Sequence, residues 1–148
     1  MYTSNASGST PCACTTVKKL SRVLGRTYDE ALASADINIT QLAVMRCISR
    51  REGEPLARVA HELEMDRTSL YRAIAPMIRD GWLVMAEGTD ARSRSVTITK
   101  RGRQVLTKAA VGWEDIQDRL IRSFGPSAYG SLMAELNRLA DCAEAARQ

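Results

Sequence analysis

The feature of this 148-residue chain that most restricts its fold is a change in the spacing of its apolar residues near residue 82. On both sides of this region, apolar residues recur every three or four positions, as they do along one face of an amphipathic helix. Within it, "WLVMAE" and "RSVTITK" are rich in apolar and β-branched residues and enclose the polar segment "GTDARS". The pattern predicts a two-stranded hairpin with a charged tip, set among helices.

Six segments with helical spacing account for most of the remaining chain. Gly53 and Gly81 are expected to end the second and fourth of them, and Thr40 and Asp66 are expected to cap their N-termini. Pro126 suits the first turn of the last helix, because its missing N–H has no partner to lose there. The predicted helices cover about residues 12–34, 40–53, 54–65, 66–81, 101–123 and 126–146.

This order of elements predicts a mainly α fold with a small β-hairpin wing. A winged helix-turn-helix is expected at about residues 40–100, flanked by the helices at about 12–34 and 101–146. The length predicts a single domain, residues 12–148, after a flexible polar tail at residues 1–11. Aromatic residues make up only 5% of the chain, which favours an aliphatic core between helices.

The positive charge of the chain is concentrated in its middle. Residues 46–108 contain 13 Lys and Arg against 8 Asp and Glu, whereas the whole chain has a net charge of +4. Such a region suits a polyanion, although a solvated surface of mixed charge has the same composition. The start of the chain has no secretory apolar region, and no apolar run approaches the ~18 residues of a membrane span. A cytoplasmic protein without a membrane partner is therefore expected.

The stretch "MDRTSLYRAIAPMIRDGWL" (65–83) combines a helix with a concentration of hydrogen-bonding groups in its first turns. A helix enters the DNA major groove by its N-terminal turns, where arginines bind guanine edges or phosphates. An ordinary helix with a polar outer face is the alternative. Pro76, further along, predicts a kink or a break into two short helices. The candidate DNA-binding residues of this helix are Arg67, Thr68, Ser69, Tyr71 and Arg72.

The predicted hairpin carries a second charged group at its tip, in "TDARSR". Asp90 alternates with Arg92 and Arg94, so the carboxylate is able to hold one arginine while another projects. A projecting arginine suits the narrow minor groove of DNA. A solvated turn is the alternative, and it becomes the weaker interpretation because the polar helix start directly precedes the hairpin.

These two pieces resemble the multiple antibiotic resistance regulator (MarR) family of winged-helix transcription factors. "MDRTSLYR" is similar to the start of that family's recognition helix. "GTDARSRSVTITKRG" is similar to its wing, in which D-x-R-x-R leads into a strand and a T-x-x-G helix start. The similarity extends over about residues 12–145. It implies a homodimer that binds a pseudo-palindromic double-stranded DNA operator, with the terminal helices of two chains interlocked.

The resemblance also implies roles for individual residues. The five helix residues would face the major groove, Arg92 would enter the minor groove, and Asp90 and Arg94 would support it. Such proteins usually repress genes and release DNA when a small phenolic or lipophilic effector binds or a cysteine is oxidised. Candidates for the effector pocket, by residue type only, are Tyr28, Arg46 and Trp113, for each of which a structural role is the alternative.

A thiol-based redox sensor is a second interpretation, because "PCACTT" places Cys12 and Cys14 at a helix N-terminus, where a thiol pKa is lowered. Unreactive thiols near a flexible tail are the alternative. A third candidate function is a non-specific architectural DNA-binding protein, which would lack operator preference. No cofactor, metal site or catalytic residue is expected, because C-x-C is too tight for zinc, His61 is the only histidine, and the sequence contains no nucleophile elbow, P-loop or GxGxxG.

Overall fold

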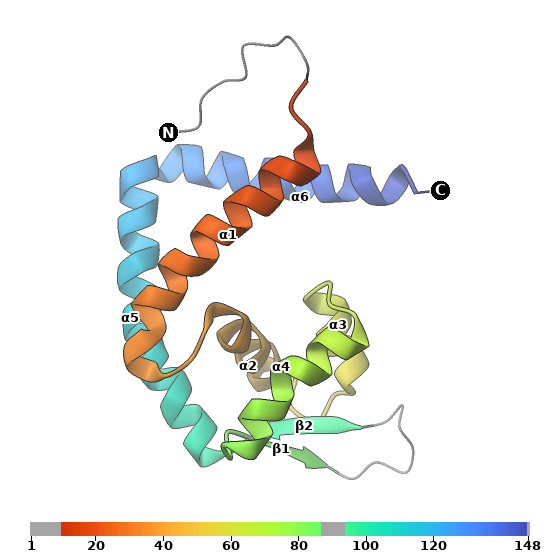
Figure 1. The fold of residues 1–148 in the computed structure, drawn as a ribbon, viewed down its shortest axis with the longest axis vertical. Coiled ribbons are helices and arrows are strands. Elements are labelled where there is room, and N and C mark those ends of the chain that lie inside the picture. The colour runs from red at the N-terminus through yellow and green to blue at the C-terminus, as the bar shows by residue number, and fades with distance from the viewer. Residues whose placement is uncertain (1–9, 87–93, 148) are drawn as a thin grey trace.

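The helices and strands follow one another in the predicted order (Figure 1). The structure is a computed structural model and describes residues 10–86 and 94–147. Within these ranges the elements are α1 (Ala13–Leu32), the 3-10 helix η1 (Ala33–Ala35), α2 (Ile39–Arg50), α3 (Leu56–Glu62), α4 (Arg67–Arg79), β1 (Leu83–Ala86), β2 (Ser95–Ile98), α5 (Lys100–Phe124) and α6 (Pro126–Ala145). The prediction of a mainly α fold with a hairpin wing is confirmed.

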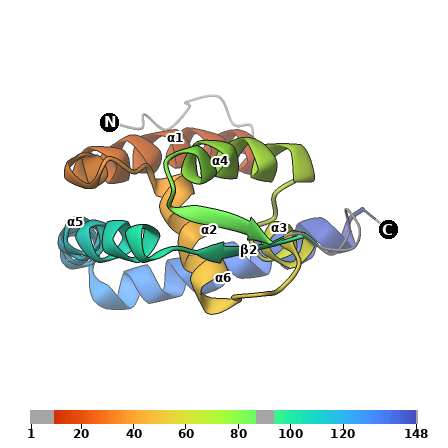
Figure 2. The ribbon, with the colours of Figure 1, turned by 90° about the horizontal axis from the view of Figure 1, so that it is seen from below.

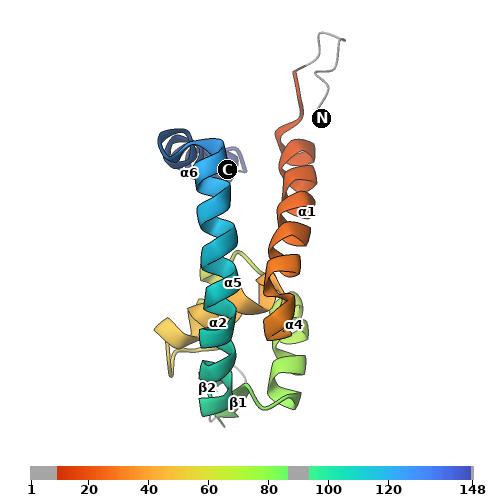
Figure 3. The same ribbon diagram turned by 90° about the vertical axis from the view of Figure 1, so that its left-hand side faces the viewer.

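Helix α2 lies at the centre of the helix-turn-helix. Figure 2 shows it between a layer that contains α1 and α4 and a layer that contains α5. It contacts α1, α3, α4, α5 and β2. Long α5 rises from the hairpin beside α1, and α6 crosses the far end of α5 (Figure 3). The hairpin and α4 therefore lie at one end of α5, and the start of α1 and helix α6 lie at the other (Figure 1).

The hydrophobic core is built around α2. Sequence spacing identified Leu42, Met45 and Ile48 as its buried side, and all three are at most 1% exposed. Val44 and Cys47 are also fully buried, because α2 is enclosed by α4 on one side and α5 on the other. Burying an aliphatic side chain of this size contributes roughly 1.5–3 kcal/mol relative to leaving it in water.

The helix ends test the capping predictions. Asp66 caps α4 and Pro126 is the first residue of α6, as predicted. The prediction of Thr40 as a cap is wrong, because α2 begins at Ile39, two residues earlier than a cap at Thr40 implies. Asn38 is the N-cap instead. Its side chain accepts a hydrogen bond from the Gln41 amide at 2.8 Å, and the Gln41 side chain accepts one from the Asn38 amide at 3.1 Å.

Helix α4 runs through Pro76 without a break. Proline removes one backbone hydrogen bond, but Ile74 and Met77 on either side of it are buried in the core and hold the helix in place. The alternative of two short helices is therefore wrong. The amide of Trp82 then donates to the carbonyl of Met77 at 2.8 Å, and Gly81 takes a φ of +74°, which turns the chain into β1.

The hairpin pairs β1 with β2 antiparallel, with Leu83 opposite Ile98 and Ala86 opposite Ser95. The segment before α3 joins the same sheet, since Pro55 bridges to Ser95 and the Leu56 amide donates to the Arg94 carbonyl at 3.0 Å. The start of α3, the first helix of the helix-turn-helix, is thus fixed to the start of β2.

Helices α1 and α6 leave apolar side chains exposed. No described residue of α6 is buried, and Leu32 is the only buried residue of α1. Val17, Val23 and Leu139 are each more than 40% exposed. Among the described residues, no helix combines the length and the apolar character needed to cross a membrane.

The start of α5 is tightly joined to the end of α4. The Thr99 hydroxyl donates to the Gly81 carbonyl at 2.7 Å and also accepts the Gly102 amide at 3.0 Å. A Cβ at Gly102 would come within 2.2 Å of the Trp82 carbonyl oxygen. Only glycine allows this approach, so the start of α5 lies directly against the turn that joins α4 to β1.

We expect Gly102→Ala to lower the free energy of unfolding by about 1–3 kcal/mol, because the added methyl group forces the start of α5 away from the Trp82 carbonyl. Urea denaturation followed by circular dichroism measures it. Gly130→Ala is the matched control, because a Cβ there meets no atom within 4 Å, and alanine in an open helical position is expected to stabilise by about 0.5–1 kcal/mol. Equal stability of Gly102→Ala and the native chain would contradict the close contact.

Candidate nucleic-acid interface

The first turn of α4 is held by its cap. The Asp66 carboxylate accepts hydrogen bonds from the Ser69 amide at 2.8 Å and from the Ser69 hydroxyl at 2.7 Å. These bonds, the amide bond first, hold the pKa of Asp66 below its usual range. The hydroxyl proton of Ser69 is therefore donated within the helix start, and Ser69 contributes to the shape of this end of α4.

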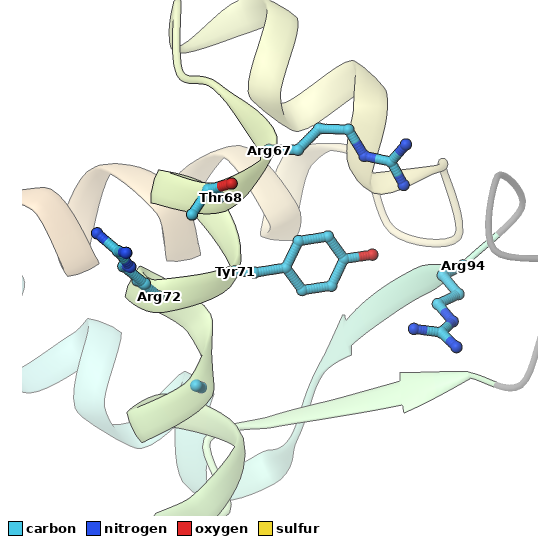
Figure 4. A pocket seen from close by; sticks show the side chains of 6 residues that line it. Arg67, Thr68, Tyr71, Arg72 and Arg94 are labelled. Atoms are coloured by element: carbon cyan, nitrogen blue, oxygen red, sulfur yellow. The ribbon is translucent and has the colours of Figure 1, made fainter.

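Four of the five predicted α4 residues share one surface with the hairpin. A hollow of about 570 Å³ lies between α4 and the start of β2. Figure 4 shows the Tyr71 ring reaching from α4 toward Arg94, with Arg67 and Arg72 on either side of it. We call this surface the α4–hairpin hollow. It is lined by Arg67, Thr68, Tyr71, Arg72, Ala75 and Arg94.

The composition of the α4–hairpin hollow suits a polyanion. Three guanidinium groups surround an aromatic ring and a hydroxyl, at the N-terminal half of a helix whose dipole adds positive potential. Ala75 was missed by sequence reasoning, although it lies one turn after Tyr71 on the same helix face. Its small side chain leaves space for a group that approaches the helix closely.

The tip of the wing lies outside the described residues. Asp90 and Arg92 fall within residues 87–93, so their predicted roles stay predictions. Arg94, immediately before β2, is described and exposed. It lies across the hollow from α4, whereas sequence reasoning assigned it only to the support of Arg92.

A group of ion pairs joins α3 and α5 to the end of α2 and the segment after it. Glu62 on α3 pairs with Arg50 at 2.8 Å and with Arg51, both at the end of α2. Hydrogen bonds from Arg51 and then Arg50 lower the pKa of Glu62 to about 2. Arg103 on α5 pairs with Glu52 at 2.6 Å. No local spacing identifies these partners, because the pairing depends on how α2, α3 and α5 pack.

The three predicted effector-pocket residues lie close together, where α1 packs on α5. Tyr28 and Trp113 line a groove of about 560 Å³ between α1, α2, α5 and α6, which we call the α1–α5 groove. Its walls also include Leu20, Leu24 and Leu136. Arg46 stacks on Trp113, with its guanidinium carbon 4.0 Å from the ring centroid, and burial lowers its pKa.

The two N-terminal cysteines are exposed at the start of α1, and Cys142 is exposed on α6. Cys12 is the N-cap residue, and hydrogen bonding from the Thr15 amide, followed by the Thr15 hydroxyl, lowers its pKa. Cys47 differs, because it is buried and burial raises its pKa. His61 is exposed on α3. Within residues 10–86 and 94–147, no three His, Cys, Asp or Glu side chains gather as metal ligands would.

Comparisons with known proteins agree with this geometry. The profile of the IclR helix-turn-helix domain matches residues 42–85. The transcriptional activatory protein BadR of Rhodopseudomonas palustris is 30% identical over 119 residues, which are 78% of this chain and 62% of BadR, so the chain spans less than two thirds of that relative. The M. tuberculosis regulator MosR, solved in complex with DNA, is 31% identical with a TM-score of 0.84, over 93% of this chain and 100% of MosR.

The chain belongs to the MarR family of winged-helix transcriptional regulators. The structure of MarR itself shares the fold, with a TM-score of 0.72 at 19% identity, over 97% of this chain and 98% of MarR. These relatives are transcription regulators, a non-enzymatic class, in agreement with the expectation that this chain is not an enzyme. In this winged helix-turn-helix arrangement, α3 and α4 form the helix pair and the hairpin forms the wing.

We expect the Glu62 ion pairs to make stability depend on acid pH. The folded pKa of about 2 lies below the ordinary value of 4.5, so the stabilisation is complete above about pH 5 and is lost as the pH falls toward 2. Glu62→Gln should therefore be less stable than the native chain at pH 7, with a difference that shrinks toward pH 2. Urea midpoints across this range measure it, with Glu30→Gln, an exposed carboxylate on α1, as the charge control. A difference independent of pH would contradict the pairing.

Proposed function

We propose that two copies of this chain form a homodimer that binds a pseudo-palindromic DNA operator and represses transcription by occupying it. The α4–hairpin hollow carries the proposal, since it joins three arginines, a tyrosine and a threonine at the end of a helix that family members insert into DNA. Repression follows if the bound dimer excludes the transcription machinery. BadR is named an activatory protein. If a reporter gene loses expression when this chain is deleted, the protein activates transcription and the proposal of repression is wrong.

Each side chain of the hollow has a suitable partner on DNA. Arg67 and Arg72 are able to bind guanine edges bidentately or to pair with phosphates. Thr68 offers a hydroxyl to a phosphate or base edge, and Tyr71 offers a flat ring to a thymine methyl group. Arg94 supports Arg92, which we propose enters the minor groove beside Asp90.

The dimer would use the exposed apolar sides of α1 and α6. Val17 and Val23 on α1 and Leu139 on α6 are exposed in the single chain, which favours an interface there. A specific dimer is expected to bury ~1,000 Å² or more of total surface. Two-fold symmetry then sets the two α4 helices about 34 Å apart, one turn of DNA, which matches the spacing of two half-sites.

The α1–α5 groove is the proposed effector site. Its volume lies within the 300–1,000 Å³ typical of small-molecule pockets, and its apolar walls with the Tyr28 hydroxyl and the Trp113 ring suit a phenolic or lipophilic compound. Arg46 would act indirectly, since it stacks on Trp113. A ligand there would release DNA by changing the spacing of the two recognition helices.

We expect Arg72→Ala and Arg92→Ala each to weaken binding to a site selected from a random DNA library by ~1–3 kcal/mol, with the dimer intact. Log affinity of the native chain should fall with log salt with a slope that reflects roughly 6–10 phosphate contacts per dimer. Fluorescence anisotropy measures both, with Arg138→Ala on α6 as the control. Equal affinity of the native chain for the selected site and a scrambled duplex would instead indicate an architectural DNA-binding protein.

A redox sensor is the second candidate function, because Cys12 and Cys14 are both exposed and the pKa of Cys12 is lowered. The thiolate is the reactive form, so a lowered pKa favours oxidation.

The two sensing mechanisms separate in one experiment. DNA release from the native chain is measured with phenol, salicylate, hexanoate as a non-aromatic control, and hydrogen peroxide. We expect the phenolic compounds to weaken operator affinity, and an equal effect of hexanoate would show that the groove selects lipophilic compounds without an aromatic ring. If peroxide also releases DNA, and still does so from Cys12→Ser and Cys14→Ser, oxidation acts elsewhere and the redox function through these residues fails.

A further inference from the structure

Helices α1, α5 and α6 meet at one line of polar side chains. The Tyr28 hydroxyl on α1 donates to the Gln117 carbonyl oxygen on α5, and the Gln117 amide nitrogen donates to the Tyr129 hydroxyl on α6 at 2.9 Å. All three residues are partly buried. Burial, followed by the nearby Tyr129, raises the pKa of Tyr28, so its hydroxyl remains a donor at neutral pH. We call this line the tyrosine–glutamine chain.

The tyrosine–glutamine chain holds a helix that has few other attachments. Helix α6 packs on α5, and none of its described residues is buried. A single residue, Gly125, separates the two helices, with a φ of +97° that favours glycine. The angle between α5 and α6 is therefore set by contacts along α6, and the hydrogen bond to Tyr129 lies in its first turn.

The same side chains border the α1–α5 groove. Tyr28 lines that groove directly. Leu136 lines it from α6 and lies seven residues after Tyr129, two turns along the same helix face. A ligand with a hydroxyl or carboxylate that enters the groove thus meets Tyr28, the first member of the chain.

Helix α5 is suited to transmit a change in the angle of α6 to α2, α4 and the hairpin, which we call the DNA-reading half. A Cβ at Gly112 would come within 2.2 Å of the Ala31 carbonyl oxygen, so α5 and α1 touch backbone to backbone there. The close contact at Gly102 joins the start of α5 to the turn after α4, and the pair of Arg103 with Glu52 joins it to the segment after α2. The DNA-reading half is expected to follow α5 as a rigid body.

We propose that Gln117 and Tyr129 are positioning residues that hold α1, α5 and α6 at the angle required for operator binding, and that a groove ligand releases DNA by taking the Tyr28 hydroxyl from Gln117. The inference rests on the proposed dimeric, DNA-binding function. It deepens that function by naming two side chains, Gln117 and Tyr129, that contact neither DNA nor the ligand. Through the angles of α1, α5 and α6, these side chains would set the spacing of the two recognition helices.

The test uses Tyr129→Phe, which removes one hydrogen bond and keeps the ring. We expect affinity for the selected operator to fall at least fivefold without any ligand, while affinity for a scrambled duplex stays within twofold, because non-specific binding does not require matched spacing. Hydrogen exchange should become faster in α6, and size-exclusion chromatography with light scattering should still report a dimer.

Two further variants separate positioning from a general loss of stability. In Gln117→Glu both tyrosine hydroxyls are able to donate to the carboxylate, so operator affinity should stay within twofold of the native chain. Arg138→Gln removes an exposed ion pair with Glu135 on the same helix and should also leave affinity unchanged.

The outcomes distinguish the two levels of the proposal. If the native chain binds the operator and Tyr129→Phe binds it equally well, the positioning role is overturned and the DNA-binding function stands. If Tyr129→Phe lowers the affinity for the operator and for the scrambled duplex to the same extent, the residue is merely structural and the positioning role is again overturned. If the native chain selects no operator at all, both proposals fail.

Discussion

The burial of α2 on two sides is the interaction on which the rest of the structure depends. Its apolar side chains face α4 on one side and α5 on the other, with Met45 and Val44 fully excluded from water. Helix α4, the hairpin and the long α5 are thereby packed around one element. The outer face of α4 then remains available for a ligand, because its inner face is already committed to the core.

Rigid joints link this core to the rest of the chain. Thr99 and Gly102 fix α5 to the end of α4, and Gly112 brings α5 against the end of α1. By contrast, α6 follows a single glycine and buries no described residue. The molecule therefore combines a firmly packed half around α2, α4 and the hairpin with a half whose geometry depends on a few polar contacts and, in the proposed dimer, on a second copy.

Much of the candidate site could be predicted because its signals are local. Arg67, Thr68, Tyr71 and Arg72 fall within two turns of one helix, and the Asp66 cap shows where that helix begins. Ser69 belonged to the same list, yet its hydroxyl donates to the cap residue Asp66, three residues earlier, instead of facing outward alone. The placement of Arg94 across the hollow from α4 depends on how the hairpin packs against the helix.

The sequence by itself determined the order of the elements, the major helix boundaries and the resemblance to the MarR family, because hydrophobic period, caps and glycines act over a few residues. Only the tertiary structure decided which side chains meet across long separations. The pairing of Glu62 with Arg50 and Arg51, and the line from Tyr28 through Gln117 to Tyr129, are examples. Such contacts depend on the packing of whole helices against α2 and α5, and no spacing along the chain encodes them.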